Sequence, residues 1–182
     1  MGSASQIAQT THGRYAATPR TLIFVTHGGD VLLVRGAPHK GWWAGRLNGV
    51  GGHIERDEDV WTSARRELRE ETGLADVAEL RLAAVINAAL GDGAHGILLF
   101  VFTARAHDRA VQPSDEGMLE WIPAHDLDRQ PVIPDLRLLL PRILDLPPTA
   151  PPLFAHYGVD ERGVMTVQFA GESPAQINFP VA

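Results

Sequence analysis

The sequence predicts an α/β fold in which a mixed β-sheet is covered by helices on both faces. Two observations support this prediction. Short runs rich in β-branched, aromatic and aliphatic residues recur along the chain, and turn-forming residues separate them, as is typical of strands. Helical patterns occur at residues 59–72 and 134–144, the first between two groups of strands and the second after the next group. Such an order favours helix layers on either side of one sheet.

The segments before the central helix predict a hairpin and a short third strand. Residues 21–26 (TLIFVT) and 31–35 (VLLVR) are the two apolar runs, and the sequence HGGD between them is a turn signal. Residues 37–45 are expected to form a loop. Residues 47–48 then begin a short strand that leads into a glycine-rich stretch.

The segments after the central helix predict two further hairpins. Residues 80–89 and 97–106 are strongly apolar and are separated by three glycines. A short strand is expected at residues 118–122. Residues 154–159 and 164–169 flank the turn sequence DERG, and they predict a C-terminal β-hairpin that adds to or covers the sheet.

The central helix is predicted over residues 59–72 because both of its ends carry signals. Three acidic residues from Asp57 precede it, and acidic side chains suit a helix N-terminus. Gly73 ends it, since glycine adopts the left-handed conformation cheaply. The stripe expected to face the core consists of Trp61, Ala64 and Leu68. An adjacent face, expected to be exposed, carries Glu67, Glu70 and Glu71.

These three glutamates, at positions i, i+3 and i+4, repel one another in an isolated helix. A hard divalent cation reverses that penalty, because Mg2+ prefers oxygen ligands and bridges to substrate phosphates. The alternative is an ordinary solvated acidic face neutralised by the neighbouring arginines. The sequence therefore raises a metal site as one interpretation of this helix.

The second helix is predicted over residues 134–144, with Leu138, Leu139 and Ile143 facing inward. Pro141 lies inside this segment and removes one helical hydrogen bond. The helix is therefore expected to kink or to start late.

Composition indicates one globular domain. The chain has 182 residues, of which 45% are hydrophobic and 21% charged, with a net charge of −6. The acidic balance and the lack of a basic run argue against binding of duplex nucleic acid. Cysteine is absent and no apolar run reaches membrane-spanning length, so a cytoplasmic protein without a membrane partner is expected. Residues 1–18 are expected to be a flexible tail, and residues 19–182 a single domain.

Residues 52–74 read GHIERDEDVWTSARRELREETGL and fit the pattern G-x5-E-x7-R-E-U-x-E-E-x-G-U, where U is aliphatic. The matching positions are Gly52, Glu58, Arg66, Glu67, Leu68, Glu70, Glu71, Gly73 and Leu74. This pattern resembles the Nudix box, and the chain is similar to Nudix hydrolases. The resemblance implies an α/β/α sandwich and hydrolysis of a nucleoside diphosphate linked to another group, with a divalent metal.

The resemblance also implies roles for individual residues. The metal, Mg2+ with Mn2+ as a substitute, would be held by the carbonyl of Gly51 and by Glu67, Glu70, Glu71 and Glu116. Arg66 would hold Glu67 through its planar guanidinium, which matches a carboxylate with two hydrogen bonds. The alternative for Arg66 is an ordinary surface ion pair. Either Glu67 or Glu116 would accept a proton during catalysis, and the sequence leaves that choice open.

Residues 44–55 (AGRLNGVGGHIE) are similar to MutT-type enzymes that hydrolyse oxidised purine nucleoside triphosphates. The resemblance places Asn48 and Asp135 against the base, Trp42 over it by stacking, and Thr21 in the same pocket. Trp43, next to Trp42, is the alternative residue for stacking on the base. The other interpretations are that Asn48 is a turn residue, that Asp135 is a helix-start residue, and that both tryptophans are packing residues. Arg35, Lys40 and Arg46 are candidate phosphate contacts.

Three positions depart from the MutT-type pattern. Leu47 and Ile133 replace aromatic residues, and Leu136 replaces a second acid. The predicted activity is metal-dependent hydrolysis of purine nucleoside triphosphates, such as 8-oxo-dGTP, to the monophosphate and pyrophosphate. The alternatives are a broad nucleotide or nucleotide-sugar pyrophosphatase and a non-catalytic nucleotide-sensing module. The partner is expected to be a small nucleotide, and the oligomeric state is left open.

Overall fold

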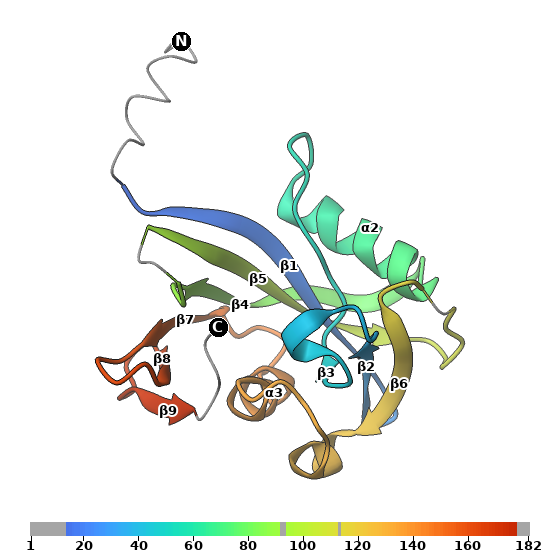
Figure 1. The fold of residues 1–182 in the computed structure, drawn as a ribbon. Coiled ribbons are helices and arrows are strands. Elements are labelled where there is room, and N and C mark those ends of the chain that lie inside the picture. Colours follow the sequence, from blue (N-terminus) through green and yellow to red (C-terminus); the bar gives the residue numbers. More distant parts are fainter. Residues whose placement is uncertain (1–13, 92–93, 113, 178–182) are drawn as a thin grey trace.

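The computed structural model describes residues 14–91, 94–112 and 114–177, and this part of the chain forms one nine-stranded sheet with two α-helices (Figure 1). The strands are β1 (Ala16–His27), β2 (Asp30–Gly36), β3 (Leu47–Asn48), β4 (Val77–Ala88), β5 (His95–Ala106), β6 (Gly117–Pro123), β7 (Leu153–Val159), β8 (Met165–Phe169) and β9 (Ala175–Ile177). The helices are α2 (Val60–Thr72) and α3 (Leu136–Leu144), and two short 3-10 helices are η1 (Gly41–Trp43) and η2 (Ala124–Arg129). Neither α-helix is long and apolar enough to cross a membrane.

The sheet is mixed, as predicted. Its strand order is β3-β2-β1-β5-β4-β7-β8-β9, and β6 pairs with β2. β1 runs parallel to β5 and β4 runs parallel to β7, whereas the remaining pairs are antiparallel. The predicted C-terminal hairpin is confirmed as β7 and β8. It extends the sheet beside β4 and gains β9 as a further strand.

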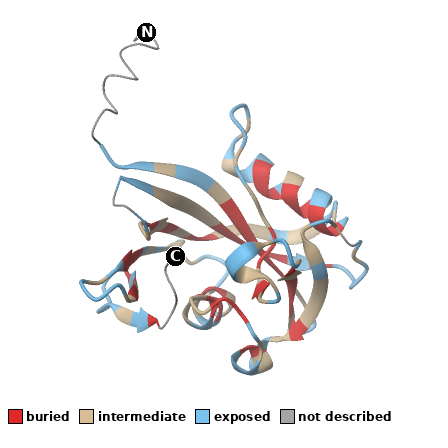
Figure 2. Ribbon diagram, in the orientation of Figure 1, coloured by how far each residue is buried: buried red, intermediate tan, exposed pale blue. Residues whose placement is uncertain are grey.

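Helices lie on opposite faces of the sheet, which confirms the predicted α/β/α sandwich (Figure 1). The alternation along β1 shows how the two faces are built. Leu22 and Phe24 belong to the core on the α3 side, and Ile23 and Val25 to the core on the α2 side. In Figure 2 the buried residues lie along the middle of the strands and on the sheet-facing sides of both helices.

Helix α2 begins and ends where the sequence predicted. Asp59 caps it by accepting hydrogen bonds from the backbone N–H groups of Trp61 and Thr62 at 2.7 and 3.0 Å. Gly73 closes it with a φ of 75°. Of the predicted inward stripe, Ala64 and Leu68 are buried, but Trp61 is 44% exposed. The prediction for Trp61 was wrong because this residue lies in the first turn, at the end of the helix, where its ring pairs with Phe102 in a T-shaped arrangement and stays half exposed.

Helix α3 begins two residues later than residue 134, with the late start that Pro141 suggested. Leu139 and Ile143 are buried as predicted, and Leu138 is only partly buried. The predicted N-terminal tail was wrong at residues 16–18, because β1 already begins at Ala16 and pairs there with β5. Residues 1–13 of that tail lie outside the described residues.

Candidate active site

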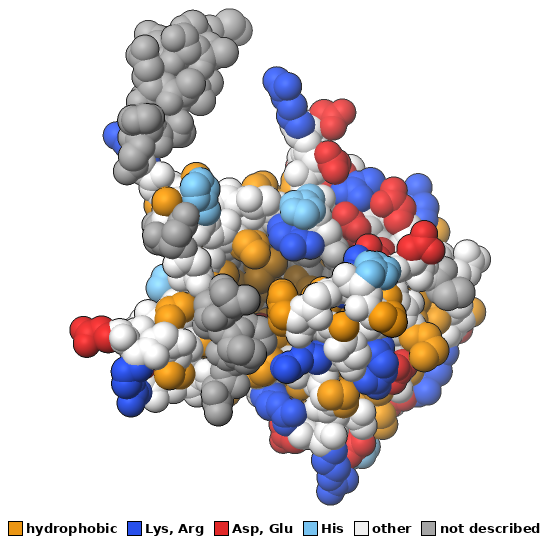
Figure 3. Space-filling model, viewed as in Figure 1, with side chains coloured by type: hydrophobic (Ala, Val, Ile, Leu, Met, Phe, Trp, Pro, Cys, Tyr) orange, Lys and Arg blue, Asp and Glu red, His pale blue; other side chains and the backbone are white. Residues whose placement is uncertain are grey.

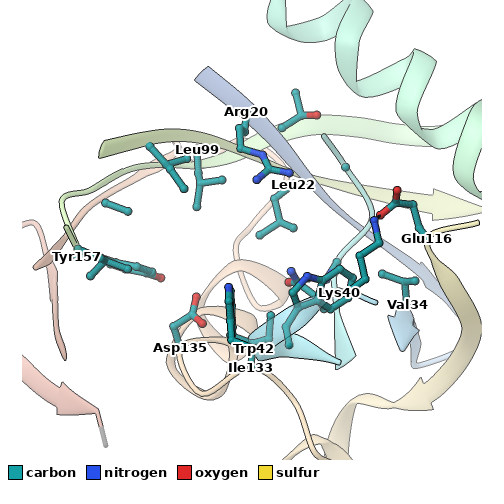
Figure 4. A pocket seen from close by; sticks show the side chains of 18 of the residues that line it. Arg20, Leu22, Val34, Lys40, Trp42, Leu99, Glu116, Ile133, Asp135 and Tyr157 are labelled. Carbon is teal, nitrogen blue, oxygen red and sulfur yellow. Dashed lines mark hydrogen bonds and ion pairs between the residues drawn. The ribbon is translucent and has the colours of Figure 1, made fainter. Parts of the chain in front are cut away.

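A cavity of about 310 Å³ opens on the α3 side of the sheet. One end is polar and lies beside Glu71 of α2, Lys40 and Glu116, and the other end is closed by Tyr157 of β7 (Figure 4). In the space-filling view, hydrophobic side chains line the hollow near the middle of the face, and acidic and basic side chains gather over α2 (Figure 3). The cavity therefore joins a charged region to an apolar one.

The glycine-rich loop between β3 and α2 lies directly against β1. The carbonyls of Val50 and Gly52 accept hydrogen bonds from Ile23 and Thr21 at 2.6 and 2.9 Å. Gly51 has a φ of 144°, and a Cβ there would lie 2.3 Å from the carbonyl oxygen of Thr21. Only glycine permits this approach. No hydrogen bond between described residues uses the Gly51 carbonyl, which the resemblance assigned to the metal.

Two of the three glutamates on the predicted acidic face of α2 are buried rather than exposed. Glu67 and Glu71 are 8% and 9% exposed, whereas the side chain of Glu70 is 58% exposed. The expectation of one exposed acidic face was wrong because the glycine loop folds over it. A Cβ on Gly52 would lie 2.4 Å from a Glu67 carboxylate oxygen, and Glu71 accepts a hydrogen bond from the Gly51 N–H at 3.2 Å.

Burial has an electrostatic consequence for these carboxylates. It raises the pKa of Glu71 to about 7, and the negative charges of Glu67 and Glu116 add to that shift. Burial also raises the pKa of Glu67, although the guanidinium of Arg66 opposes the effect. A nearby cation would therefore stabilise the charged forms of Glu67 and Glu71.

Arg66 makes its two-bond contact with Glu58, not with Glu67. Nε and Nη2 donate to the two carboxylate oxygens of Glu58 at 3.1 and 2.7 Å. Nη1 donates to Glu67 at 2.8 Å and to Glu70 at 3.0 Å. Arg66 therefore contacts Glu67 as predicted, but through a single hydrogen bond. Only the predicted two-bond geometry was wrong, because neighbouring residues on a helix do not face each other. The hydrogen bonds from Arg66 lower the pKa of Glu58 to about 2.

Lys40 and Glu116 form an ion pair at the polar end of the cavity. Lys40 precedes η1 and its ammonium also lies 6.0 Å from the centre of the Trp43 ring. Glu116 precedes β6 and lies close enough to Glu71 for its charge to raise the pKa of that residue. The fold thus brings Glu116 to the box helix across a separation of more than forty residues, as the resemblance implied.

The residues at this end suit a divalent cation. They offer carboxylate oxygens and the Gly51 carbonyl, which no described residue hydrogen-bonds, and such oxygens are the ligands that Mg2+ prefers. Arg66 and Lys40 neutralise Glu67, Glu70 and Glu116 in this structure. Within the described ranges, no three acidic or histidine side chains converge into a ready-made metal cluster. Metal binding would therefore exchange some of these ion pairs for metal contacts.

Most of the predicted substrate residues line the cavity: Thr21, Lys40, Trp42, Trp43, Asn48 and Asp135. Arg35 and Arg46 do not line the cavity, and their role as phosphate contacts stays a prediction. Arg35 lies on β2, and its guanidinium donates two hydrogen bonds, at 2.5 and 2.9 Å, to Glu120 on β6. Arg35 and Glu120 are diagonal neighbours on paired strands, so they form a cross-strand ion pair.

Asn48 fits both interpretations that the sequence offered, whereas the side chain of Asp135 makes no capping hydrogen bond with a described residue at the start of α3. The side-chain oxygen of Asn48 accepts a hydrogen bond from the Gly49 N–H at 2.8 Å, which supports the turn, and the residue also lines the cavity. Asp135 lies at the N-cap position of α3 and borders the cavity as well. Burial raises the pKa of Asp135 to about 6. Trp42 is 55% exposed and contributes to the wall.

Several lining residues were not predicted from the sequence. Ile97 and Leu99 alternate along β5, and that period of two could have indicated a shared face. Arg20, Tyr157 and Met165 carried no local signal. Glu58 belongs to the box but was given no role, because its pairing with Arg66 depends on how the chain enters α2.

The NUDIX domain family matches residues 16–143 of this chain. The chain is 33% identical over 109 residues to an uncharacterised Nudix hydrolase, YvcI, of Bacillus subtilis, covering 58% of this chain and 66% of that one. It is 31% identical over 116 residues to an oxidized purine nucleoside triphosphate hydrolase of Danio rerio, covering 61% and 67%. The matches thus span about two thirds of the length of these relatives.

Solved structures share the fold. A MutT protein of Bacillus halodurans superposes with a TM-score of 0.69 at 22% identity, covering 86% of this chain and 99% of that one. The NUDIX domain of Shewanella oneidensis NrtR, complexed with ADP ribose, gives a TM-score of 0.58 at 20% identity, covering 78% and 96%. At these identities the likeness concerns the fold.

Proposed function

The chain belongs to the Nudix family and is a MutT-like Nudix hydrolase, and from that premise we propose that it hydrolyses purine nucleoside triphosphates to the monophosphate and pyrophosphate with Mg2+. The observation that carries the proposal is the continuity of the cavity. Its polar end, beside Glu71 and Glu116, suits a metal and phosphates, and its apolar end suits a base. Mn2+ is expected to support activity as a substitute for Mg2+.

Each polar residue at the phosphate end has a proposed task. Glu67, Glu70, Glu71, Glu116 and the Gly51 carbonyl would hold the cation. When bound, a divalent cation supplies charge neutralisation at phosphate oxygens and makes water more acidic. Arg66 positions Glu67 and Glu70, and Lys40 would be available to bind a phosphate where Glu116 holds the cation. Glu67 or Glu116 accepts the proton of the attacking water.

The base end offers hydrogen-bond groups on apolar walls. Asn48 presents its amide nitrogen, and Asp135 a carboxyl whose raised pKa of about 6 lets it donate or accept near neutral pH. Leu136 stands where the related pattern has a second acid, and it is buried in the core. We therefore expect only a modest preference for 8-oxo-dGTP over dGTP.

A broader nucleotide pyrophosphatase is the second candidate. The similar NUDIX domain that was solved with ADP ribose, and the missing second acid at Leu136, favour it. A non-catalytic sensing module is less well supported, because all the box carboxylates are present.

A substrate panel separates these functions. We would measure kcat/KM with Mg2+ for 8-oxo-dGTP, dGTP, dATP, UDP-glucose and ADP-ribose, and identify products by mass. The proposal expects a purine triphosphate to be the best substrate and pyrophosphate to be the second product. Faster hydrolysis of both sugar-linked diphosphates would replace it with the broader activity. Glu70→Gln serves as the background control for contaminating phosphatases.

A further inference from the structure

The inner end of the cavity is built by a segment outside the family match. Tyr157 lies on β7 and Met165 on β8, and both line the cavity, whereas the NUDIX domain match ends at residue 143. β7 is fixed on both sides, by parallel pairing with β4 and antiparallel pairing with β8. The C-terminal hairpin therefore acts as a rigid wall of the cavity.

Tyr157 presents a polar group that no described residue satisfies. The residue is 2% exposed, and its hydroxyl has no hydrogen-bond partner among the described residues. Figure 4 shows its ring directed into the cavity on the same side as Asp135. A buried hydroxyl without a partner costs stability, and phenylalanine would pack the same space without that cost. The hydroxyl is thus placed to meet a ligand.

A second polar group in the cavity has the same property. Thr21, on β1, is 2% exposed, and its hydroxyl also lacks a partner in the described part of the chain. Asp135 contributes a carboxyl to the same cavity. Leu90 and Leu99 make the neighbouring walls apolar. A few polar groups on apolar walls are typical of a site for a planar ligand that carries its own hydrogen-bonding edge.

We propose that Tyr157 is a specificity-determining residue whose hydroxyl donates a hydrogen bond to the purine base of the substrate. The inference rests on the proposed function, because that function places a base in this end of the cavity. A tyrosine hydroxyl donates to a ring nitrogen or a carbonyl oxygen, both of which purines offer. The contact lies at the opposite end of the cavity from Glu71 and Glu116, so it affects binding rather than chemistry.

The test compares Tyr157→Phe with Tyr15→Phe, which removes the hydroxyl of the only other tyrosine in the chain. The Tyr15 hydroxyl donates to Asn87 and does not face the cavity, so it is a matched control. Calorimetry with guanosine monophosphate, without metal, should give a Kd about 3- to 10-fold higher for Tyr157→Phe and unchanged for Tyr15→Phe. With the best triphosphate, KM should rise by a similar factor while kcat stays within about twofold.

The outcomes separate this inference from the proposed function. Unchanged guanosine monophosphate affinity in Tyr157→Phe, an equal loss in both variants, or no binding by the wild type would each overturn the role of Tyr157. A higher Kd for guanosine monophosphate in Tyr157→Phe but not in Tyr15→Phe supports the role of Tyr157. It does so even if the substrate panel shows no triphosphate hydrolysis and the proposed function fails. A purely structural role predicts a changed melting temperature with unchanged Kd.

Discussion

Arg66 and Glu58 form the two-bond ion pair of the box, joining the residue before the N-cap of α2 to a position two turns along the helix. The pair leaves one guanidinium nitrogen to reach Glu67 and Glu70. Glu58 is therefore an indirect positioning residue, because it orients Arg66, which in turn orients Glu67 and Glu70.

Replacing Arg66 tests this arrangement. An ammonium cannot reproduce the planar contacts, so Arg66→Lys should lower kcat by about 10- to 100-fold, with a smaller rise in KM. Glu58→Gln should show the same pattern, because the amide loses the charge that the pair requires. The exposed neighbour Arg65→Lys is the control. Unchanged kcat in Arg66→Lys would make Arg66 an ordinary surface ion pair.

The box glutamates predict opposite effects on activity and stability. Glu70→Gln and Glu71→Gln should each lower kcat by more than about 100-fold at saturating Mg2+, since even outer-shell partners of metal ligands cost 10- to 100-fold. Glu71 has a raised pKa of about 7, so its charge opposes folding above that pH. Glu71→Gln should therefore raise the unfolding free energy at pH 8 without metal.

Added Mg2+ should stabilise the wild type and not Glu71→Gln, because binding to the native state shifts the folding equilibrium. Denaturation with and without Mg2+ measures this difference, and Glu161→Gln, in the distant β7–β8 turn, controls for loss of one charge. Near-wild-type turnover in both Glu70→Gln and Glu71→Gln would refute the metal assignment.

The parts of the fold that depend on local signals were predictable. Asp59 and Gly73 give the bounds of α2, and alternation and turn residues give most of the strands. The parts that depend on distant segments were not. The glycine loop buries Glu67 and Glu71 only because it also pairs with β1. The burial of Glu67 and Glu71 could therefore not be predicted from the sequence of α2 alone.

The same limit applies to the site. The box, Asn48 and Asp135 follow from family patterns, and Lys40 was a candidate because it is basic. The fold brings Glu71, Asn48, Lys40 and Asp135 to one cavity. The pairing of Arg35 with Glu120 joins residues 85 positions apart, and strand register decides it. Tyr157 reaches the cavity because β7 runs parallel to β4, a long-range pairing for which the sequence has no short signal.

Lys40, the only lysine in the chain, should compete with the metal for Glu116. Lys40→Met should tighten Mg2+ binding to the free protein by up to about 5-fold, because partly exposed ion pairs contribute about 1 kcal/mol or less. It should raise KM for the triphosphate by about 10-fold or more, because a charged phosphate contact is lost.

Amine labelling of the wild type gives a direct readout of this exchange. Modification of Lys40, followed by mass spectrometry, should speed up when Mg2+ is added and slow down when a non-hydrolysable triphosphate follows. A labelling rate that does not respond to Mg2+ would show that the ion pair between Lys40 and Glu116 persists and that Glu116 does not bind the metal.

Asp135 predicts a pH-dependent stability. Burial raises its pKa from 3.8 to about 6, so the charged form is disfavoured in the folded protein. The resulting contribution is fully present below pH 3.8, is lost as the pH rises to about 6, and stays lost above that value. Asn mimics the protonated carboxyl. Asp135→Asn should therefore match the wild type near pH 4 and exceed its unfolding free energy at pH 8. The full shift corresponds to roughly 3 kcal/mol, and because the cavity leaves the side chain partly exposed, about 1–2 kcal/mol is expected.

Urea denaturation of Asp135→Asn and the wild type at pH 4 and pH 8 measures the difference, with exposed Asp128→Asn as the control. A difference between Asp135→Asn and wild type that is the same at both pH values would mean that the carboxyl titrates as an ordinary aspartate, and the base end of the cavity would then offer a permanent anion instead of a group that can donate a hydrogen bond.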